Sequence, residues 1–315
     1  MTRERYKFNP ADFSKITSYS ISGRKSLVNT SMFSDVEAYK QSGRISSLFP
    51  LILKGNDIRD VAAAIRLAKK NGRPVVLAMG AHVIKCGLSP ILIDLMERGF
   101  IDAIAMNGAG AVHDLEIAYN GATSEDVAVE IKEGRFGMVE ETSSHFNGAL
   151  KKFATGDIGI GQALGRYIVE EKMPNTAQSL LACGWELKIP VTIHAAIGTD
   201  IVHIHPNADG EITGRATLND FRLFAGIVSQ LGGGVYLNVG SSVILPEVFI
   251  KALSAARNLG HHVSEFMTVN MDMIQHYRPS VNVVNRPIQG AGRGISITGH
   301  HEIMVPLLYH LLVSE

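Results

Sequence analysis

Short apolar runs that alternate with helical patterns constrain this chain more than any other feature, and they are clearest in residues 73–120. An apolar run at Val75–Met79 is followed by a helical pattern over Ile91–Arg98 and by a second apolar run at Ile101–Met106. Apolar runs of this length, separated by helices, are typical of parallel strands that are buried on both faces. The stretch therefore predicts a strand, helix, strand unit of a parallel sheet, followed by another helix.

Both predicted strands end in turns of small residues, GAHVIKCG at Gly80–Gly87 and NGAGAVHD at Asn107–Asp114. In open parallel sheets ligands bind at the carboxyl ends of the strands. Small residues let the backbone come close to such a ligand. We therefore expect the two turns to form two walls of one site.

The same alternation continues to residue 313. Further strands are predicted at Ile189–His194, Val235–Val239, Glu265–Met271 and Gly294–Thr298. Helices are predicted at Ile58–Ala68, Ser124–Glu133, Ile158–Glu171, Asn175–Leu187, Leu218–Leu231, Glu247–Leu259 and Ile303–Val313, and residues 134–142 are expected to form a loop. No linker divides these units, so residues 49–315 are predicted to be one α/β domain. Its expected fold is Rossmann-like and doubly wound, with a mostly parallel sheet and helices on both faces.

Residues 1–48 are polar and are predicted to form an N-terminal arm with a short helix near Phe33–Gln41. Such an arm either wraps a neighbouring subunit or forms a loosely ordered terminus. The charged fraction of 19% is low for a soluble monomer, which favours a homo-oligomer.

Composition disfavours several classes of partner. The 30 basic and 30 acidic residues balance, so no net field favours nucleic acid or an anionic membrane. Two cysteines, Cys86 and Cys183, are too few for a disulfide framework. Neither a secretory signal nor a long apolar segment is evident, and a cytoplasmic location is expected.

Several polar residues in the predicted turns are candidates for chemistry. Lys85 is a candidate nucleophile or base if its amine is desolvated, and otherwise a lysine that reaches solvent or a phosphate. His82 and His113 suit a general acid and base, or are satisfied polar residues, and Asp114 is a catalytic acid or a helix cap. Asp200, with Thr199 before it, suits an amine or a ribose, or serves only to shape the turn.

Histidines also suggest a metal as a weaker alternative. His203-Ile204-His205 alternates as a strand would, with both imidazoles on one face and Glu211 nearby. His261-His262 and His300-His301-Glu302 add further imidazoles, but no fixed metal-binding spacing occurs, so no metal site is predicted. Arg286 and Arg293 flank a Gly-rich loop and either clamp an anion or lie on the surface.

Taken together, the motifs resemble those of deoxyhypusine synthase and its prokaryotic relatives. The resemblance runs from about Leu51 to Leu312 and rests on GAHVIKCG, NGAGAVHDL, WELKIPV from Trp185, DFRLF from Asp220, LGGGV from Leu231 and VPLL from Val305. It implies a Rossmann-like fold assembled as a homotetramer of dimers, with NAD as cofactor. It also implies oxidation of a polyamine and passage of an aminobutyl group through an enzyme lysine to an acceptor amine.

The resemblance assigns roles to particular positions. Its nucleotide-binding turns correspond to Gly80, His82, Lys85 and Gly87, to Asn107, Gly108, Ala109 and Gly110, and loosely to Gly198, Thr199 and Asp200. Asn270 and His300-His301 match further positions near the nucleotide, and Gly240 ends another predicted strand. The predicted cofactor-binding set is therefore Gly80, His82, Gly87, Asn107, Ala109, Gly110, Thr199, Gly240, Asn270 and His300. The predicted catalytic set is Lys85, His113, Asp114, Asp200 and His203.

Two departures from the family change the expected function. The family's nucleophilic lysine is absent from Val281–Ser296, and no lysine follows Lys251. The family's two polyamine-facing acids are replaced by Val112 and His113. We therefore interpret the chain as a diverged homologue, an NAD-dependent transferase-like enzyme that acts on a small amine by hydride transfer and imine chemistry. A non-catalytic oligomeric NAD- or metabolite-binding protein is the main alternative, and a His-rich metal hydrolase is a third.

Overall fold

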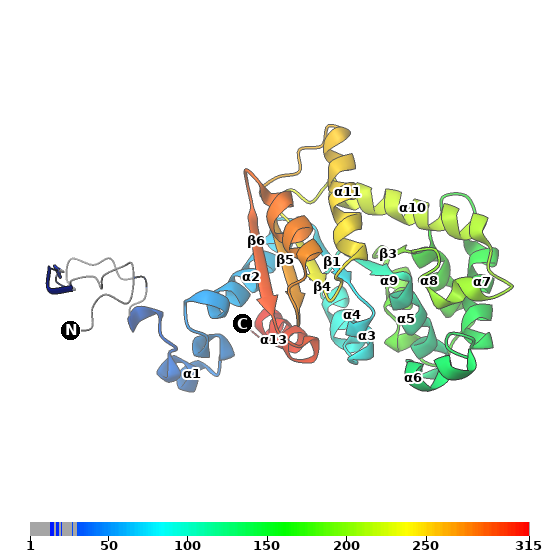
Figure 1. Cartoon of the computed structure of the whole chain (residues 1–315), viewed down its shortest axis with the longest axis horizontal. Helices are drawn as coiled ribbons and strands as arrows, with labels where there is room; N and C mark the ends of the chain where they lie inside the picture. The colour runs from blue at the N-terminus through cyan, green and yellow to red at the C-terminus, as the bar shows by residue number, and fades with distance from the viewer. Residues whose placement is uncertain (1–12, 16, 19, 21–26, 28–29, 315) are drawn as a thin grey trace, which may run out of the picture.

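Six parallel strands form the centre of the molecule in the computed structural model, which describes residues 13–15, 17–18, 20, 27 and 30–314 (Figure 1). The strands are β1 (Val75–Met79), β2 (Ala103–Asn107), β3 (Val191–His194), β4 (Val235–Val239), β5 (Met267–Asp272) and β6 (Arg293–Thr298). Their order across the sheet is β3-β2-β1-β4-β5-β6, and every pair is parallel. The predicted Rossmann-like, doubly wound α/β fold is confirmed.

Helices follow the strands in chain order. The α-helices are α1 (Val36–Ser42), α2 (Leu53–Lys70), α3 (His82–Lys85), α4 (Ser89–Glu97), α5 (Gly108–Asn120), α6 (Val127–Glu130), α7 (Glu140–Phe153), α8 (Ile160–Glu170), α9 (Leu180–Leu187), α10 (Gly210–Val228), α11 (Ile244–Asn258), α12 (Tyr277–Pro279) and α13 (His301–Val313). Short 3-10 turns are η1 (Phe13–Lys15), η3 (Thr30–Met32), η4 (Ile45–Leu48), η5 (Ile131–Glu133), η6 (Thr176–Gln178), η7 (Ile201–Ile204) and η9 (Arg286–Ile288), and η8 (Ser280–Asn285) is a π-helix. Among the described helices, none has both the length and the apolar character that crossing a membrane requires.

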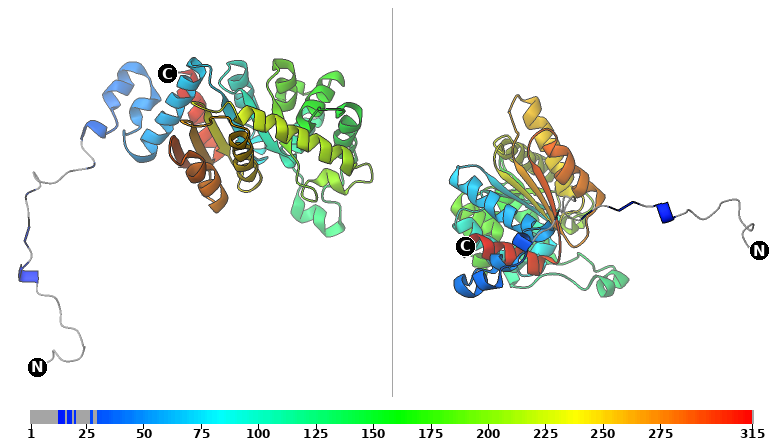
Figure 2. Two further views of the ribbon diagram at one scale, coloured as in Figure 1. Left: turned by 90° about the horizontal axis from the view of Figure 1, so that it is seen from above. Right: turned by 90° about the vertical axis from the view of Figure 1, so that its left-hand side faces the viewer.

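Alternate residues of β1, β2 and β4 enter two different cores, as the pleat of a strand requires. One row, in register across the sheet, consists of Val191, Ile104, Leu77, Leu237, Val269 and Ile295, and it packs against α2, α4, α5 and α13. On the opposite face, Val76 and Tyr236 pack against Phe224 of α10 and Phe249 of α11. Helices cover both faces of the sheet in the view from above (Figure 2). Burial on both faces explains why the strands read as continuous apolar runs.

Several local predictions were wrong. Residues 140–142 were expected to lie in a loop but begin α7, whose first turn places Glu140 and Glu141 where carboxylates stabilise a helix. The single helix predicted over Ser124–Glu133 is instead α6 and η5. The strand expected at His203–His205 is the end of η7 and the residue after it.

The N-terminal arm has apolar side chains that the rest of the chain leaves uncovered. The short helix expected near Phe33–Gln41 is present as α1, which has Asp35 as N-cap, Gly43 as C-cap and no buried residue. Phe33, Val36 and Tyr39 are exposed. That the arm wraps a neighbouring subunit stays a prediction. The boundary between the arm and the α/β domain, between residues 48 and 49, also stays a prediction. Residues 1–12 of the arm lie outside the described part of the chain.

Candidate functional site

The carboxyl ends of all six strands lie at one edge of the sheet, beside α3 and α13 (Figure 1). The strand order reverses between β1 and β4, because β1 is followed outward by β2 and β3 on one side and by β4, β5 and β6 on the other. In folds of this kind the crevice outside such a reversal holds the ligand. The turns after β1 and β4 are therefore the first place to look for a site.

These two turns touch each other. A Cβ atom added to Gly80 would lie 2.2 Å from the Gly240 carbonyl oxygen, and the Gly80 N–H donates to Val239 O at 2.9 Å. Gly240 has a φ of 67°, and a Cβ there would lie 2.8 Å from Cε1 of His301. Only glycine fits at either position without displacement, so the predicted residues Gly80 and Gly240 form one close-packed floor with His301.

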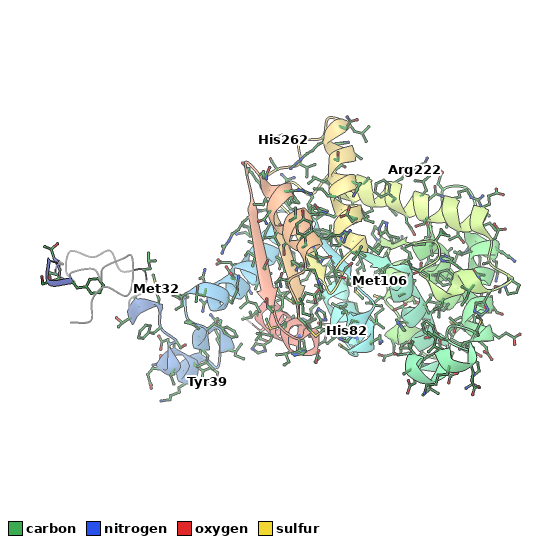
Figure 3. All side chains as sticks on the ribbon, in the orientation of Figure 1. Met32, Tyr39, His82, Met106, Arg222 and His262 are labelled. Atoms are coloured by element: carbon green, nitrogen blue, oxygen red, sulfur yellow. The ribbon has the colours of Figure 1, made fainter. Side chains whose placement is uncertain are left out.

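Titratable side chains gather around this floor. The rings of His82 and His301 meet edge to face, with centroids 5.7 Å apart. Burial lowers the pKa of His301, and the Asp272 carboxylate at the end of β5 opposes that shift. Glu302 lies 3.7 Å from the Cys86 Sγ and 3.8 Å from Nδ1 of His300. Figure 3 shows His82 at this edge and His262 at the opposite end of the sheet.

A second group of predicted residues meets at the start of α5. The Asn107 side chain accepts from the Gly110 N–H at 3.0 Å. The Asp200 carboxylate lies directly over Gly108, where an added Cβ would be 2.1 Å from Oδ2, and it also accepts from the Ala196 N–H at 3.2 Å. Burial raises the pKa of Asp200, which hydrogen bonds from Ala196, Thr199 and Ala109 and the nearby His203 oppose. The start of α5 is thus occupied by carboxylate and amide groups of the chain itself.

Buried carboxylates likewise occupy the starts of α8 and α9. Asp114 accepts from Ser179 Oγ at 2.5 Å and from the N–H groups of Leu180 and Leu181 at 2.8 and 3.1 Å. Burial raises its pKa to about 6. Asp220 accepts from Gly161 and Ile193, and burial raises its pKa to about 7. Asp114 lies inside α5 and is not itself a helix N-cap, because Ser179 is the N-cap of α9 and Asp114 accepts from Ser179 and from the first N–H groups of that helix.

At the starts of α11 and α13 the N-cap residues, Val243 and His300, make no side-chain cap hydrogen bond, and no buried carboxylate of another described element is bonded there. The Ser241 hydroxyl accepts from Leu245 N–H at 3.2 Å in α11. In α13 the Glu302 carboxylate accepts its own N–H. Both helices begin at the β1/β4 reversal, since Ser241 follows Gly240 and His301 contacts it. The start of α11 is therefore the better placed of the described helix termini for an anionic ligand.

Other predicted residues lie away from this floor or have other partners. Lys85 is exposed at the end of α3, so its amine is not desolvated as the sequence allowed, and Gly87 is also exposed. Nδ1 of His113 lies 2.6 Å from Thr123 Oγ1, beside a hollow of about 420 Å³ that Glu116, Tyr119 and Glu125 help to line. Asn270 is buried and bonded to Asn238 and Gln275.

The His203–His205 interpretation also fails in its geometry. Because η7 is helical, the imidazoles of His203 and His205 do not share one face of a strand. Nε2 of His205 forms a hydrogen bond with Gly137 O at 2.8 Å. Nδ1 of His203 is buried and has no hydrogen-bond partner in the described part of the chain. Arg293 pairs with Asp57 and Asp60 of α2, and Arg286 donates to Asn282. In the part of the chain that the structure describes, no three His, Cys, Asp or Glu side chains are placed to hold a metal ion.

Sequence reasoning missed several buried polar residues near the edge. Asp272 and Asp220 were not singled out, and neither was His194, whose pKa burial lowers to about 4. His301 was noted only beside His300. A strand-end position was the available signal for Asp272 and His194, which end β5 and β3.

Comparison with known proteins finds solved structures that share the fold without assigning the chain to a family. No family model matches. Over 90 residues the chain is 31% identical to the ornithine cyclodeaminase of Methanothermobacter thermautotrophicus, a match that covers 29% of this chain and 20% of that protein. The chain thus spans about a fifth of the length of this curated relative.

Several solved structures share the fold. The complex of AgrE with ornithine and NAD+ matches with a TM-score of 0.56 at 16% identity, over 82% of this chain and 33% of AgrE. A conserved LOR/SDH protein from Methanococcus maripaludis S2 gives 0.53 at 18% identity, over 83% and 70% of the two chains. A deoxyhypusine synthase homologue from Entamoeba histolytica gives 0.50 at 11%, over 88% and 95%. The resemblance to deoxyhypusine synthase is thus one of several likenesses of fold.

Proposed function

We propose that this chain is an NAD-dependent enzyme that oxidises the carbon–nitrogen bond of a small amine. The observation that carries the proposal is the reversal of strand order between β1 and β4, where the turns after these two strands pack together through Gly80 and Gly240. In doubly wound sheets a dinucleotide binds in the crevice outside such a reversal. AgrE, which has a similar fold, was solved with ornithine and NAD+.

The residues at the β1/β4 reversal fit NAD in their chemistry. Gly80, Gly240 and Ser241 would border it, and the start of α11, whose N-cap residue Val243 makes no side-chain hydrogen bond, would face its phosphates. When bound, NAD+ supplies the acceptor for a hydride. The carboxylates of Asp272 and Glu302, on the same edge, give a protonated amine a favourable electrostatic environment. His82 is exposed beside them and is free to contact substrate.

The resemblance to deoxyhypusine synthase also implies that the oxidised group passes to an acceptor through an imine on an enzyme lysine. No lysine occupies the corresponding position in this chain. Residues 281–296 form η8, η9 and the start of β6 without a lysine, and Lys85 is exposed on α3. We therefore propose that the imine forms on the substrate's own nitrogen and is released or captured there. Because this lysine is missing, a non-catalytic NAD-binding protein is the second candidate function.

The purified protein should be incubated with NAD+ and a panel of diamines and amino acids that includes ornithine and putrescine. We expect NADH to form with at least one amine, together with the matching carbonyl or cyclised product in the mass spectrum. NAD binding without oxidation of any amine would favour the non-catalytic alternative, and absence of NAD binding would reject both.

A further inference from the structure

The acidic and basic residues of this chain are unevenly distributed. Residues 116–142 contain seven acidic and two basic residues, a net charge of −5, whereas residues 1–29 contain six basic and two acidic residues, a net charge of +4. The chain as a whole is neutral. Patches of opposite charge attract each other across an interface and select the partner. The chain therefore carries two regions whose charges complement each other.

The acidic region surrounds a hollow of about 420 Å³ between the end of α5 and the start of α7. We call it the acidic hollow, because the carboxylates of Glu116, Glu125 and Glu141 line it and no lysine or arginine does. Within the described chain, the only salt-bridge partner of these three carboxylates is the His113 ring, whose Nδ1 lies 3.8 Å from Glu116. The negative charge of the hollow is thus left for a partner to neutralise.

Hydrogen bonds fix the walls of the acidic hollow. Thr142 of α7 donates to Glu116 of α5 at 2.8 Å, and the Gly137 N–H donates to Glu125 at 3.1 Å. The adjoining α6 and η5 expose large apolar side chains, which are Val127, Val129 and Ile131. Protein interfaces combine apolar contacts with a polar rim in this way. A basic segment with apolar side chains of its own would fit this surface.

The first 29 residues of the arm have that character. Besides their six basic residues they include Phe13 and Leu27, and both of these side chains are exposed. The arm contains α1, which lies at one end of the long axis of the molecule, whereas α6 lies at the other end (Figure 1). Two copies with antiparallel long axes would each bring the arm beside the other copy's acidic hollow. The two contacts would be identical about a two-fold axis, the commonest symmetry of protein dimers.

We propose that residues 1–29 of one copy dock in the acidic hollow of a second copy, so that the two copies exchange their arms. The lysines and arginines of the arm pair with the carboxylates of the hollow, and its apolar side chains cover those that α6 and η5 expose. The inference is independent of the proposed function, because the acidic hollow shares no lining residue with the β1/β4 reversal.

Charge reversal in the whole chain tests this proposal. Sedimentation velocity should show a wild-type dimer that weakens tenfold or more between about 0.1 M and about 1 M salt, because the screening length falls from about 10 Å to about 3 Å. Glu141→Lys and Lys25→Glu should each weaken the dimer about fivefold. The matched controls Glu186→Lys and Lys70→Glu reverse exposed charges on α9 and α2 and should dimerise as the wild type does. A monomeric wild type, or a dimer that neither salt nor the two arm and hollow variants weaken, would overturn the proposal.

Cross-linking identifies which copy receives the arm. A carbodiimide joins a lysine amine to a carboxylate that it contacts. In a mixture of unlabelled and isotope-labelled protein, mass spectrometry should find mixed-isotope peptides that link Lys15 or Lys25 to Glu125 or Glu141. Links confined to a single copy, or no link between the arm and the hollow, would overturn docking in a second copy. Neither measurement depends on NAD or an amine, so failure of the proposed function would leave both results interpretable.

Discussion

The Asp220 carboxylate joins the edge strand β3 to the start of α8. It accepts from the Ile193 N–H at 3.0 Å and from the Gly161 N–H at 3.1 Å. These bonds satisfy backbone donors that the sheet edge and the helix start would otherwise leave unpaired. The packing of α8 against β3 therefore depends on Asp220, a buried carboxyl group that is costly to ionise.

Asp220 predicts a specific dependence of stability on pH. Burial raises its pKa from 3.8 to about 7, so the folded state holds a proton that the unfolded state releases. Its contribution to the free energy of unfolding is fully present below about pH 4 and is lost as the pH rises through 7. Asp220→Asn should remove this dependence and should lower stability by on the order of 1–3 kcal/mol at low pH.

Urea unfolding of wild type and variant between these pH values measures the difference. Asp157→Asn, an exposed acid before α8, is the control and should leave the slope unchanged. A wild-type minus Asp220→Asn difference that grows with pH would contradict the assigned pKa direction.

At the scale of elements, close approach between α8 and β3 depends on Gly161. A Cβ added there would lie 1.7 Å from the Val191 carbonyl oxygen, whereas a Cβ at Gly148 of α7 meets nothing within 4 Å. Both glycines lie in helices, so they form a matched pair.

Alanine at these two positions should have opposite effects. Gly161→Ala should destabilise the protein by about 2 kcal/mol or more, because α8 must move away from β3. Gly148→Ala should stabilise it by about 0.5–1 kcal/mol, since alanine favours an unobstructed helix. Urea midpoints measure both, and equal effects at the two positions would show that α8 does not pack as described.

The elements also show how far sequence reasoning reaches. The predicted β1 and β4 have the observed bounds, because strands buried on both faces appear as uninterrupted apolar runs. The start of α7 was missed because its Glu140-Glu141-Thr142 is as polar as a loop. Contacts between distant residues, such as Asp114 with Leu180 or Asp220 with Ile193, leave no local pattern in the sequence, so neither contact was predicted.

For the whole molecule, the fold brings only part of the predicted site together. Gly80, His82, Gly240 and His300 gather at the β1/β4 reversal with His301, whereas Asn107, Ala109, Thr199 and Asp200 gather at the start of α5. The first group lies beside the start of α11, whose N-cap residue makes no side-chain hydrogen bond, whereas the Asp200 carboxylate occupies the second group. We therefore assign NAD to the first group.

Calorimetric titration with NAD is the most direct test of this assignment. The wild type should bind NAD, and His82→Glu, which adds a negative charge beside the floor, should weaken binding about tenfold or more, or about 1.4 kcal/mol. His262→Glu adds the same charge at the opposite end of the sheet and should bind as the wild type does. Absence of NAD binding to the wild type, or equal binding by the two glutamate variants, would contradict a cofactor site at the β1/β4 reversal.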